Sequence, residues 1–212
     1  MKLGLFGGSF DPIHRAHVEL ARAARDEAGL DRVLFLPTAD PPHKPPRAAP
    51  AWARFVMVEL ALLEEEGLFA SAHEMTPGRR AYTVQTLEHF RELEPDATWH
   101  LLLGSDSLAQ LHTWRRWREI PRAAPLVVLR RPGWGPEEVR KSIPAELVEL
   151  LREGSEAAPQ ARGGLPPPLW VGEPRDVSST ALRQVLARGD EPPVGDLPAR
   201  VLDYIQKYGL YR

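Results

Sequence analysis

The stretch that decides the fold is residues 2–17, KLGLFGGSFDPIHRAH. Lys2–Phe6 is largely apolar and is predicted to be a buried strand. The loop Gly7–Pro12 follows, and its two glycines allow a tight turn and a close approach of the backbone to a ligand. A helix is predicted over His14–Ala28, which is rich in Ala, Leu, Glu and Arg. This order of strand, loop and helix indicates an α/β protein with a ligand at its first loop.

His14 and His17 are three residues apart, so they are expected on one face of this helix. The first turn also offers free backbone N–H groups and the positive end of the helix dipole. Together these features favour a bound phosphate. A structural turn that carries two surface histidines remains the alternative.

The same alternation continues along the chain. Further strands are predicted at Arg32–Leu36, Leu68–Glu74, Thr98–Leu103, Leu126–Leu129 and Leu169–Gly172. Further helices are predicted at Trp52–Glu65, Tyr82–Glu92, Pro144–Arg152, Ser179–Arg188 and Pro198–Tyr208, with proline-rich connections at 37–50 and 158–168. Solid apolar strands followed by helices are typical of a doubly wound parallel sheet. We therefore expect an α/β fold in a single domain over residues 1–212, with a small C-terminal helical part from about residue 173.

In such sheets, ligands bind beyond the carboxyl ends of the strands. Gly104 and Asp106 come directly after a predicted strand, where Asp106 could accept hydrogen bonds from a ribose hydroxyl. Trp114 and Trp117 follow in an arginine-rich context, and one of them could stack on a heterocycle. Packing within a helix is the alternative for either tryptophan.

Two further segments carry candidate phosphate ligands. Ser178, Ser179 and Thr180 are residue types favoured at a helix N-terminus, and Arg183 follows about one turn later. Arginine can bind two phosphate oxygens at once, although an ordinary cap with a solvated arginine remains open. Within the loop at 37–50, His43 and Lys44 could cover a phosphate or belong to a rigid spacer.

Composition excludes several classes of protein. A net charge of -2 gives no electrostatic case for nucleic acid as the main partner. The chain has no cysteine, which excludes disulfides, thiolate metal sites and a cysteine nucleophile. The first residues become polar too soon for a signal peptide or membrane anchor, so we expect a cytoplasmic protein.

Taken together, these segments resemble the bacterial nicotinate-nucleotide adenylyltransferases, which belong to a Rossmann-like nucleotidyltransferase superfamily. Residues 7–17 are similar to the family signature GG[ST]FDPxHxGH, and residues 41–44 to its PPHK loop. Residues 81–87, 103–117 and 177–183 are similar to its S-Y-T-x-x-T-L, GxD…W and I-S-S-T-x-I-R blocks. Five blocks in the family's order and spacing are far more specific than any one alone.

The resemblance implies adenylyl transfer from ATP to nicotinate mononucleotide, with release of pyrophosphate, by direct in-line attack and without a covalent intermediate. It implies that the triphosphate is bound by His14, His17 and Arg183, assisted by Ser178, Ser179 and Thr180. The adenosine and ribose sites would be lined by Gly8, Ser9, Phe10, Gly104 and Asp106. Nicotinate mononucleotide would be bound by His43, Lys44, Thr83, Trp114 and Arg115, with backbone amides of Thr83 and Arg115 receiving the carboxylate. Mg²⁺ would be held through the ATP phosphates rather than by a protein cage.

Two positions depart from the family pattern. Ala16 stands where the signature has glycine, and Ala81 stands where the family has serine. Sister transferases acting on nicotinamide mononucleotide, pantetheine phosphate or a cytidylyl donor remain rivals, as does a nucleotide-binding regulator that has lost catalysis. RNA binding is disfavoured by the net charge, and the oligomeric state is left open.

Overall fold

The structure is a computed structural model that describes residues 1–39, 48–76, 81–152 and 167–212. Its centre is a six-stranded, fully parallel sheet in the order β3-β2-β1-β4-β5-β6. The strands are β1 Lys2–Gly8, β2 Arg32–Pro37, β3 Leu68–Ala70, β4 Thr98–Gly104, β5 Leu126–Leu129 and β6 Leu169–Val171. This confirms the predicted doubly wound, Rossmann-like α/β fold.

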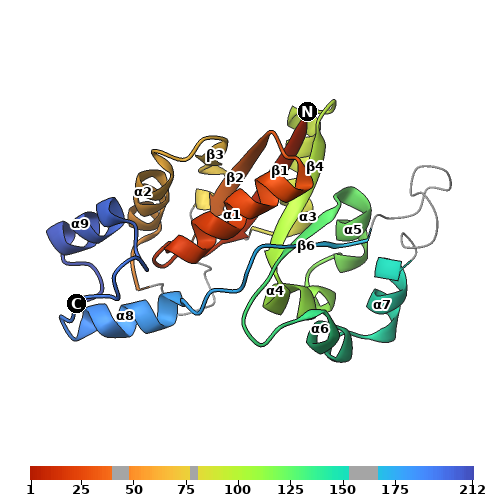
Figure 1. The fold of residues 1–212 in the computed structure, drawn as a ribbon. Coiled ribbons are helices and arrows are strands. Elements are labelled where there is room, and N and C mark those ends of the chain that lie inside the picture. Colours follow the sequence, from red (N-terminus) through yellow and green to blue (C-terminus); the bar gives the residue numbers. More distant parts are fainter. Residues whose placement is uncertain (40–47, 77–80, 153–166) are drawn as a thin grey trace.

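Helices cover both faces of the sheet (Figure 1). One face is covered by α1 Arg15–Ala28 and α2 Ala51–Leu62. The C-terminal helices α8 Ser179–Ala187 and α9 Ala199–Tyr208 extend this layer beyond the strands, with α9 against α2 (Figure 1). The other face is covered by α3 Thr83–Leu93, α4 Ser105–Ala109, α5 Ile120–Ala123, α6 Pro136–Ser142 and α7 Ala145–Arg152. Short 3₁₀ turns lie at η1 His73–Met75, η2 Leu111–Thr113 and η3 Trp117–Glu119. Among the described helices, none is long and apolar enough to cross a bilayer.

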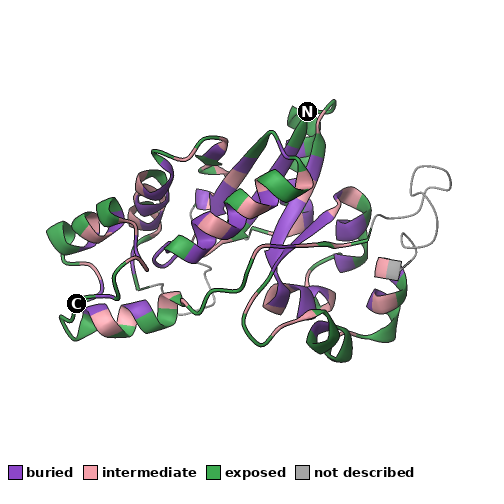
Figure 2. Cartoon of the chain, viewed as in Figure 1, coloured by how far each residue is buried: buried purple, intermediate pink, exposed green. Residues whose placement is uncertain are grey.

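The strands are largely apolar because both faces of the sheet are covered by helices. In β1, Leu5 faces the core beneath α3 and Phe6 faces the core beneath α1, as the alternation of a strand requires. Figure 2 shows the buried residues concentrated on the strands and on the inner sides of the helices. Leu182 of α8 and Val201 of α9 belong to the same core cluster as Phe6, so the C-terminal helices share the core of the sheet.

Most predicted elements are found within one to three residues of their expected ends. β1 is longer than predicted: it includes Gly7 and Gly8, because Gly8 still pairs with Pro37 of β2. The prediction of a strand as far as Glu74 is wrong, since β3 ends at Ala70 and the chain turns into η1. The helices α4, α5 and α6 were not predicted, because segments of four to seven residues are too short for a helical period to show.

The strand order reverses between β1 and β4. From β1 the chain passes through α1 to β2 on one side, whereas β4 is followed by β5 on the other. The loops that leave β1 and β4 therefore diverge and leave a crevice between them, which is where ligands bind in open α/β sheets. The loop after β1 contains His14, and the first turn of α4, directly after β4, contains Asp106.

Candidate active site

The loop after β1 ends in a pair of stacked histidines. His14 is the N-cap of α1, and His17 is the third residue of that helix. Their ring centroids are 3.6 Å apart, and the backbone N–H of His14 donates to Nδ1 of His17 at 3.2 Å. Because that Nδ1 is an acceptor, a neutral His17 carries its proton on Nε2 and can donate it to a ligand.

Both histidines are buried, with 1% and 8% of their surface exposed. Burial, with a contribution from the charge of Arg131, lowers the pKa of His14 to about 3. Burial and the charges of His14 and Arg131 also lower the pKa of His17 well below its ordinary value. These pKa values favour neutral imidazoles at pH 7, so His14 and His17 would contact a phosphate as hydrogen-bonding groups rather than as positive charges.

Arg131 is the functional candidate that the sequence analysis missed. It lies two residues after the end of β5, and its Nε is 4.0 Å from Oδ1 of Asp106. Both atoms, together with Nδ1 of His14, are buried and have no hydrogen-bond partner among the described residues. Since buried polar atoms are nearly always paired, these three indicate a polar ligand at the crevice. The signal available in the sequence was the position of Arg131 at the carboxyl end of a strand.

Two glycines allow close approach at the crevice. A Cβ on Gly8 would lie 2.8 Å from the ring of Phe10, and one on Gly104 would lie 2.4 Å from Oδ1 of Asp106 and 3.3 Å from Nε of Arg131. The residue that turns the first loop is Phe10, whose φ is 45°. Gly8 and Gly104 therefore make room for neighbouring side chains. The tight turn predicted at Gly7 and Gly8 lies instead at Phe10, because both glycines belong to β1.

Arg183 reaches the first loop from α8. Its Nη1 donates to the backbone oxygen of Asp11 at 2.7 Å, and its Nη2 donates to Oγ1 of Thr180 at 3.2 Å. Ser179 Oγ donates to the backbone oxygen of Pro12 at 2.9 Å. Ser178 caps α8 by accepting from the N–H of Ala181, so its own O–H is still available to a ligand. The arginine is thus bound to the loop that carries His14 rather than simply solvated.

Arg54 of α2 is fully buried and fixes the strand ends beside the crevice. Its guanidinium donates to the backbone oxygens of Ser9 at 2.6 Å, Thr38 at 2.8 Å and Ala49 at 3.2 Å. These oxygens belong to the loops after β1 and β2 and to the segment before α2. A charged residue within an apolar helix was the sequence signal for this role, and it was not recognised.

A cavity of about 270 Å³ opens beside the crevice. Its lining includes five of the predicted ligand-binding residues: Gly8, Ser9, Thr83, Gly104 and Trp114. The guanidinium carbon of Arg115 lies 4.7 Å from the ring centre of Tyr82, the N-cap of α3, so Arg115 is also close to Thr83. The structure therefore brings the predicted nicotinate residues Thr83, Trp114 and Arg115 together.

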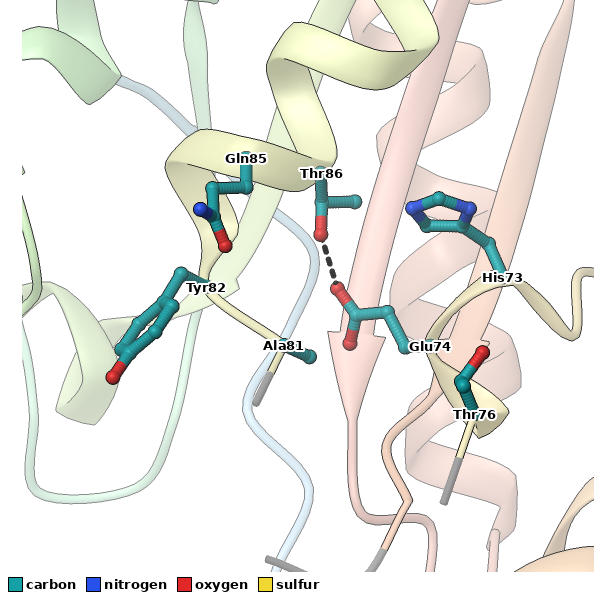
Figure 3. A pocket seen from close by; sticks show the side chains of 7 residues that line it. All are labelled: His73, Glu74, Thr76, Ala81, Tyr82, Gln85 and Thr86. Carbon is teal, nitrogen blue, oxygen red and sulfur yellow. Dashed lines mark hydrogen bonds between the residues drawn. The ribbon is translucent and has the colours of Figure 1, made fainter. Parts of the chain in front are cut away.

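Glu74 lines both this cavity and a smaller pocket, which is drawn in Figure 3. Its Oε1 accepts a hydrogen bond from Oγ1 of Thr86 at 2.7 Å, which connects η1 to α3. Burial raises the pKa of Glu74, and the hydrogen bond from Thr86 opposes that rise. The backbone oxygen of Glu74 accepts from the N–H of Ala39, so this residue also fixes the chain after β2.

Some predicted residues lie elsewhere. The Phe10 ring is in the core against Phe6 and His17, so only its backbone can line a nucleotide site. Trp117 is buried in the core, which leaves Trp114 as the tryptophan at the cavity. Ala16 is buried within the protein, so its methyl group is absorbed by packing. His43 and Lys44, like most of the predicted loops at 37–50 and 158–168, lie outside the described residues.

Comparison with known proteins first places the chain in a class. A family model described as "Cytidylyltransferase-like" matches residues 5–185, which is most of the chain. The chain, with its parallel sheet, is thus of the nucleotidyltransferase class.

The particular family follows from curated relatives. A protein of Laribacter hongkongensis named "Probable nicotinate-nucleotide adenylyltransferase" is 42% identical over 99% of this chain and 94% of its own length. One of the same name from Gloeobacter violaceus is 40% identical over 99% of this chain and 96% of its own. The chain belongs to the nicotinate-nucleotide adenylyltransferase family.

A solved structure agrees with the fold. The nicotinic acid mononucleotide adenylyltransferase of Plasmodium falciparum, in complex with NaAD, aligns with a TM-score of 0.74 and 18% identity. The alignment covers 99% of this chain and 97% of that one. At this level of identity the likeness supports the architecture alone.

Proposed function

We propose that this enzyme transfers the adenylyl group of ATP to nicotinate mononucleotide, giving nicotinate adenine dinucleotide and pyrophosphate in NAD biosynthesis. A phosphate oxygen of the mononucleotide attacks the α-phosphorus of ATP in line, the bond to the β-phosphate breaks, and pyrophosphate leaves. Family membership supports the reaction. The observation that carries the assignment to this site is the crevice itself, where Gly8 and Gly104 share a cavity with Thr83 and Trp114.

The reaction needs no general base from the protein. The attacking phosphate monoester has a second pKa of about 6 and is largely ionised at neutral pH. What it needs is two anions held together and charge stabilised as pyrophosphate leaves. Arg131 and Arg183 supply that positive charge, while neutral His14 and His17 supply hydrogen bonds from the first turn of α1.

The nicotinate carboxylate is assigned to the N-terminus of α3. Thr83 is the first residue of this 11-residue helix, where backbone N–H groups are not used by the helix and the dipole favours an anion. Trp114 lines the same cavity and offers its ring for stacking. Ala81 beside them brings no hydroxyl, so the backbone and Trp114 carry the recognition.

Mg²⁺ fits this site as an ion carried by ATP. The side chains described at the crevice are imidazoles, guanidiniums and the carboxylate of Asp106, whose Oδ1 faces Arg131. Mg²⁺ prefers several oxygen ligands such as phosphate and water. Among the described residues, no group of three or more His, Cys, Asp or Glu could hold a metal. When bound, Mg²⁺ would neutralise part of the charge on the phosphates.

The test is a coupled pyrophosphate-release assay with ATP and one acceptor at a time, with the dinucleotide product identified by mass. Nicotinate mononucleotide is expected to be the best acceptor by kcat/KM. Nicotinamide mononucleotide should be poorer, because its NH₂ group would face N–H donors. Equal kcat/KM for the two, or faster release with pantetheine phosphate, would contradict the assigned pocket.

A further inference from the structure

Asp11 joins four segments that are distant in sequence. It is buried in the loop between β1 and α1, with 3% of its surface exposed. Its carboxylate accepts hydrogen bonds from the backbone N–H groups of Ala48 and Ala49 at 3.0 and 3.1 Å, and from the hydroxyl of Tyr211 at 2.8 Å. Its backbone oxygen accepts from Arg183. Displacement of Asp11 would therefore move the acceptor that holds Arg183.

Tyr211 lies in the turn after α9, with its ring in the core cluster beneath α1. Its φ of 68° is uncommon for a residue with a side chain. Phe10, next to Asp11, has a φ of 45°. Such conformations cost on the order of 1–3 kcal/mol each and persist where the surroundings hold them. One such strained residue, Tyr211, makes the hydrogen bond to Asp11, and the other, Phe10, directly precedes Asp11.

The hydroxyl of Tyr211 stays protonated and so remains a hydrogen-bond donor to Asp11. Burial and the adjacent charge of Asp11 raise the pKa of Tyr211, so the phenol is neutral throughout the range in which enzymes are assayed. Without that hydroxyl, the buried Oδ1 of Asp11 would keep only the N–H of Ala49 among its described partners. A buried carboxylate that loses a donor shifts to recover one.

We propose that Tyr211 is a positioning residue for adenylyl transfer: its hydroxyl fixes Asp11, and Asp11 fixes Arg183 beside the turn that carries His14. This inference rests on the proposed function. Misplacement of reacting groups by about 1 Å can cost up to about 10²-fold in rate. The Tyr211–Asp11 hydrogen bond lies on the face of the sheet that carries α1 and the proposed triphosphate site. Thr83 and α3, which would bind nicotinate, lie on the opposite face.

The test is Tyr211→Phe, which removes the hydroxyl and keeps the ring. We expect kcat to fall about 5- to 20-fold, with the KM for nicotinate mononucleotide within about twofold of wild type. The matched control is Tyr208→Phe, which removes an exposed hydroxyl from α9 and should leave both constants unchanged. A purely structural role would lower the melting temperature and leave kcat intact.

A kcat for Tyr211→Phe within twofold of wild type overturns the proposal, whatever happens to the melting temperature. So does a loss that raises the KM for nicotinate mononucleotide as much as it lowers kcat. A double-mutant cycle adds a second criterion: if Tyr211 acts through Asp11, adding Tyr211→Phe to Asp11→Asn should cost little more, and additive losses contradict it. Failure of the proposed function would be seen separately, as wild-type protein that makes no dinucleotide.

Discussion

His14 and His17 stack face to face, with 3.6 Å between ring centroids, and a hydrogen bond from the His14 backbone to Nδ1 of His17 holds them together. The contact fixes the tautomer of His17 and buries both rings against the first turn of α1. The pair is therefore oriented before any substrate arrives, which is the condition under which hydrogen-bond donors stabilise a transition state.

Replacing His17 with alanine should lower kcat by at least about 10²-fold, the scale observed when one preorganised donor to a transition state is lost. The circular dichroism spectrum should stay that of a folded protein. His100→Ala is the matched control, because His100 lies on β4 away from the crevice and should leave kcat unchanged. Near-normal turnover of His17→Ala would refute the assigned role.

The lowered pKa of His14 predicts a loss of stability in acid. The unfolded chain takes up a proton on this residue near pH 6.5, whereas the folded protein does so only near pH 3. The unfolded state therefore binds more protons between these values, and stability falls as pH falls through this window. The contribution of His14 is about 1.4 kcal/mol per pH unit.

This contribution can be isolated with His14→Gln. Urea unfolding between pH 4 and 7 should show a shallower pH dependence in the variant than in wild type. Carboxylates elsewhere affect both proteins alike and cancel in the difference. Parallel curves would show that His14 is not held neutral by the fold.

Arg131 is predicted to act on both the histidines and the nucleotide. Arg131→Gln should raise the pKa of His14 in an NMR titration, because a nearby positive charge is removed. It should also lower kcat/KM for ATP by about 10-fold or more, the scale of one lost charged hydrogen bond. Arg130→Gln removes the exposed neighbouring charge and should do neither. An unchanged His14 titration would contradict the proximity on which the assignment depends.

Arg54→Met should lower the free energy of unfolding by about 3 kcal/mol or more, because three buried or partly buried backbone oxygens lose their donor. Arg91→Met, on the exposed side of α3, should change it by no more than about 0.5 kcal/mol. Both values can be measured by urea unfolding at pH 7. Comparable effects from the two substitutions would mean that the buried hydrogen bonds of Arg54 are not what stabilises the strand ends.

Local sequence could predict the site residues that lie where a strand ends or a helix begins. His14 and His17 follow a strand and begin a helix, and Gly104 ends another strand, so their place at the sheet edge could be predicted. The run of hydroxyl residues from Ser178, followed by Arg183 about one turn later, likewise predicted the start of α8 and its N-cap. These predictions needed only the period of a helix or strand and the rule for parallel sheets.

The sequence by itself determined the strands, most of the helices, the parallel α/β class and the blocks that identify the family. Only the tertiary structure decided that the histidines are neutral, that Arg131 faces Asp106, and that Tyr211 binds Asp11. The physical reason is distance along the chain. Burial and charge at one residue are set by neighbours up to 200 positions away, and no local pattern records them.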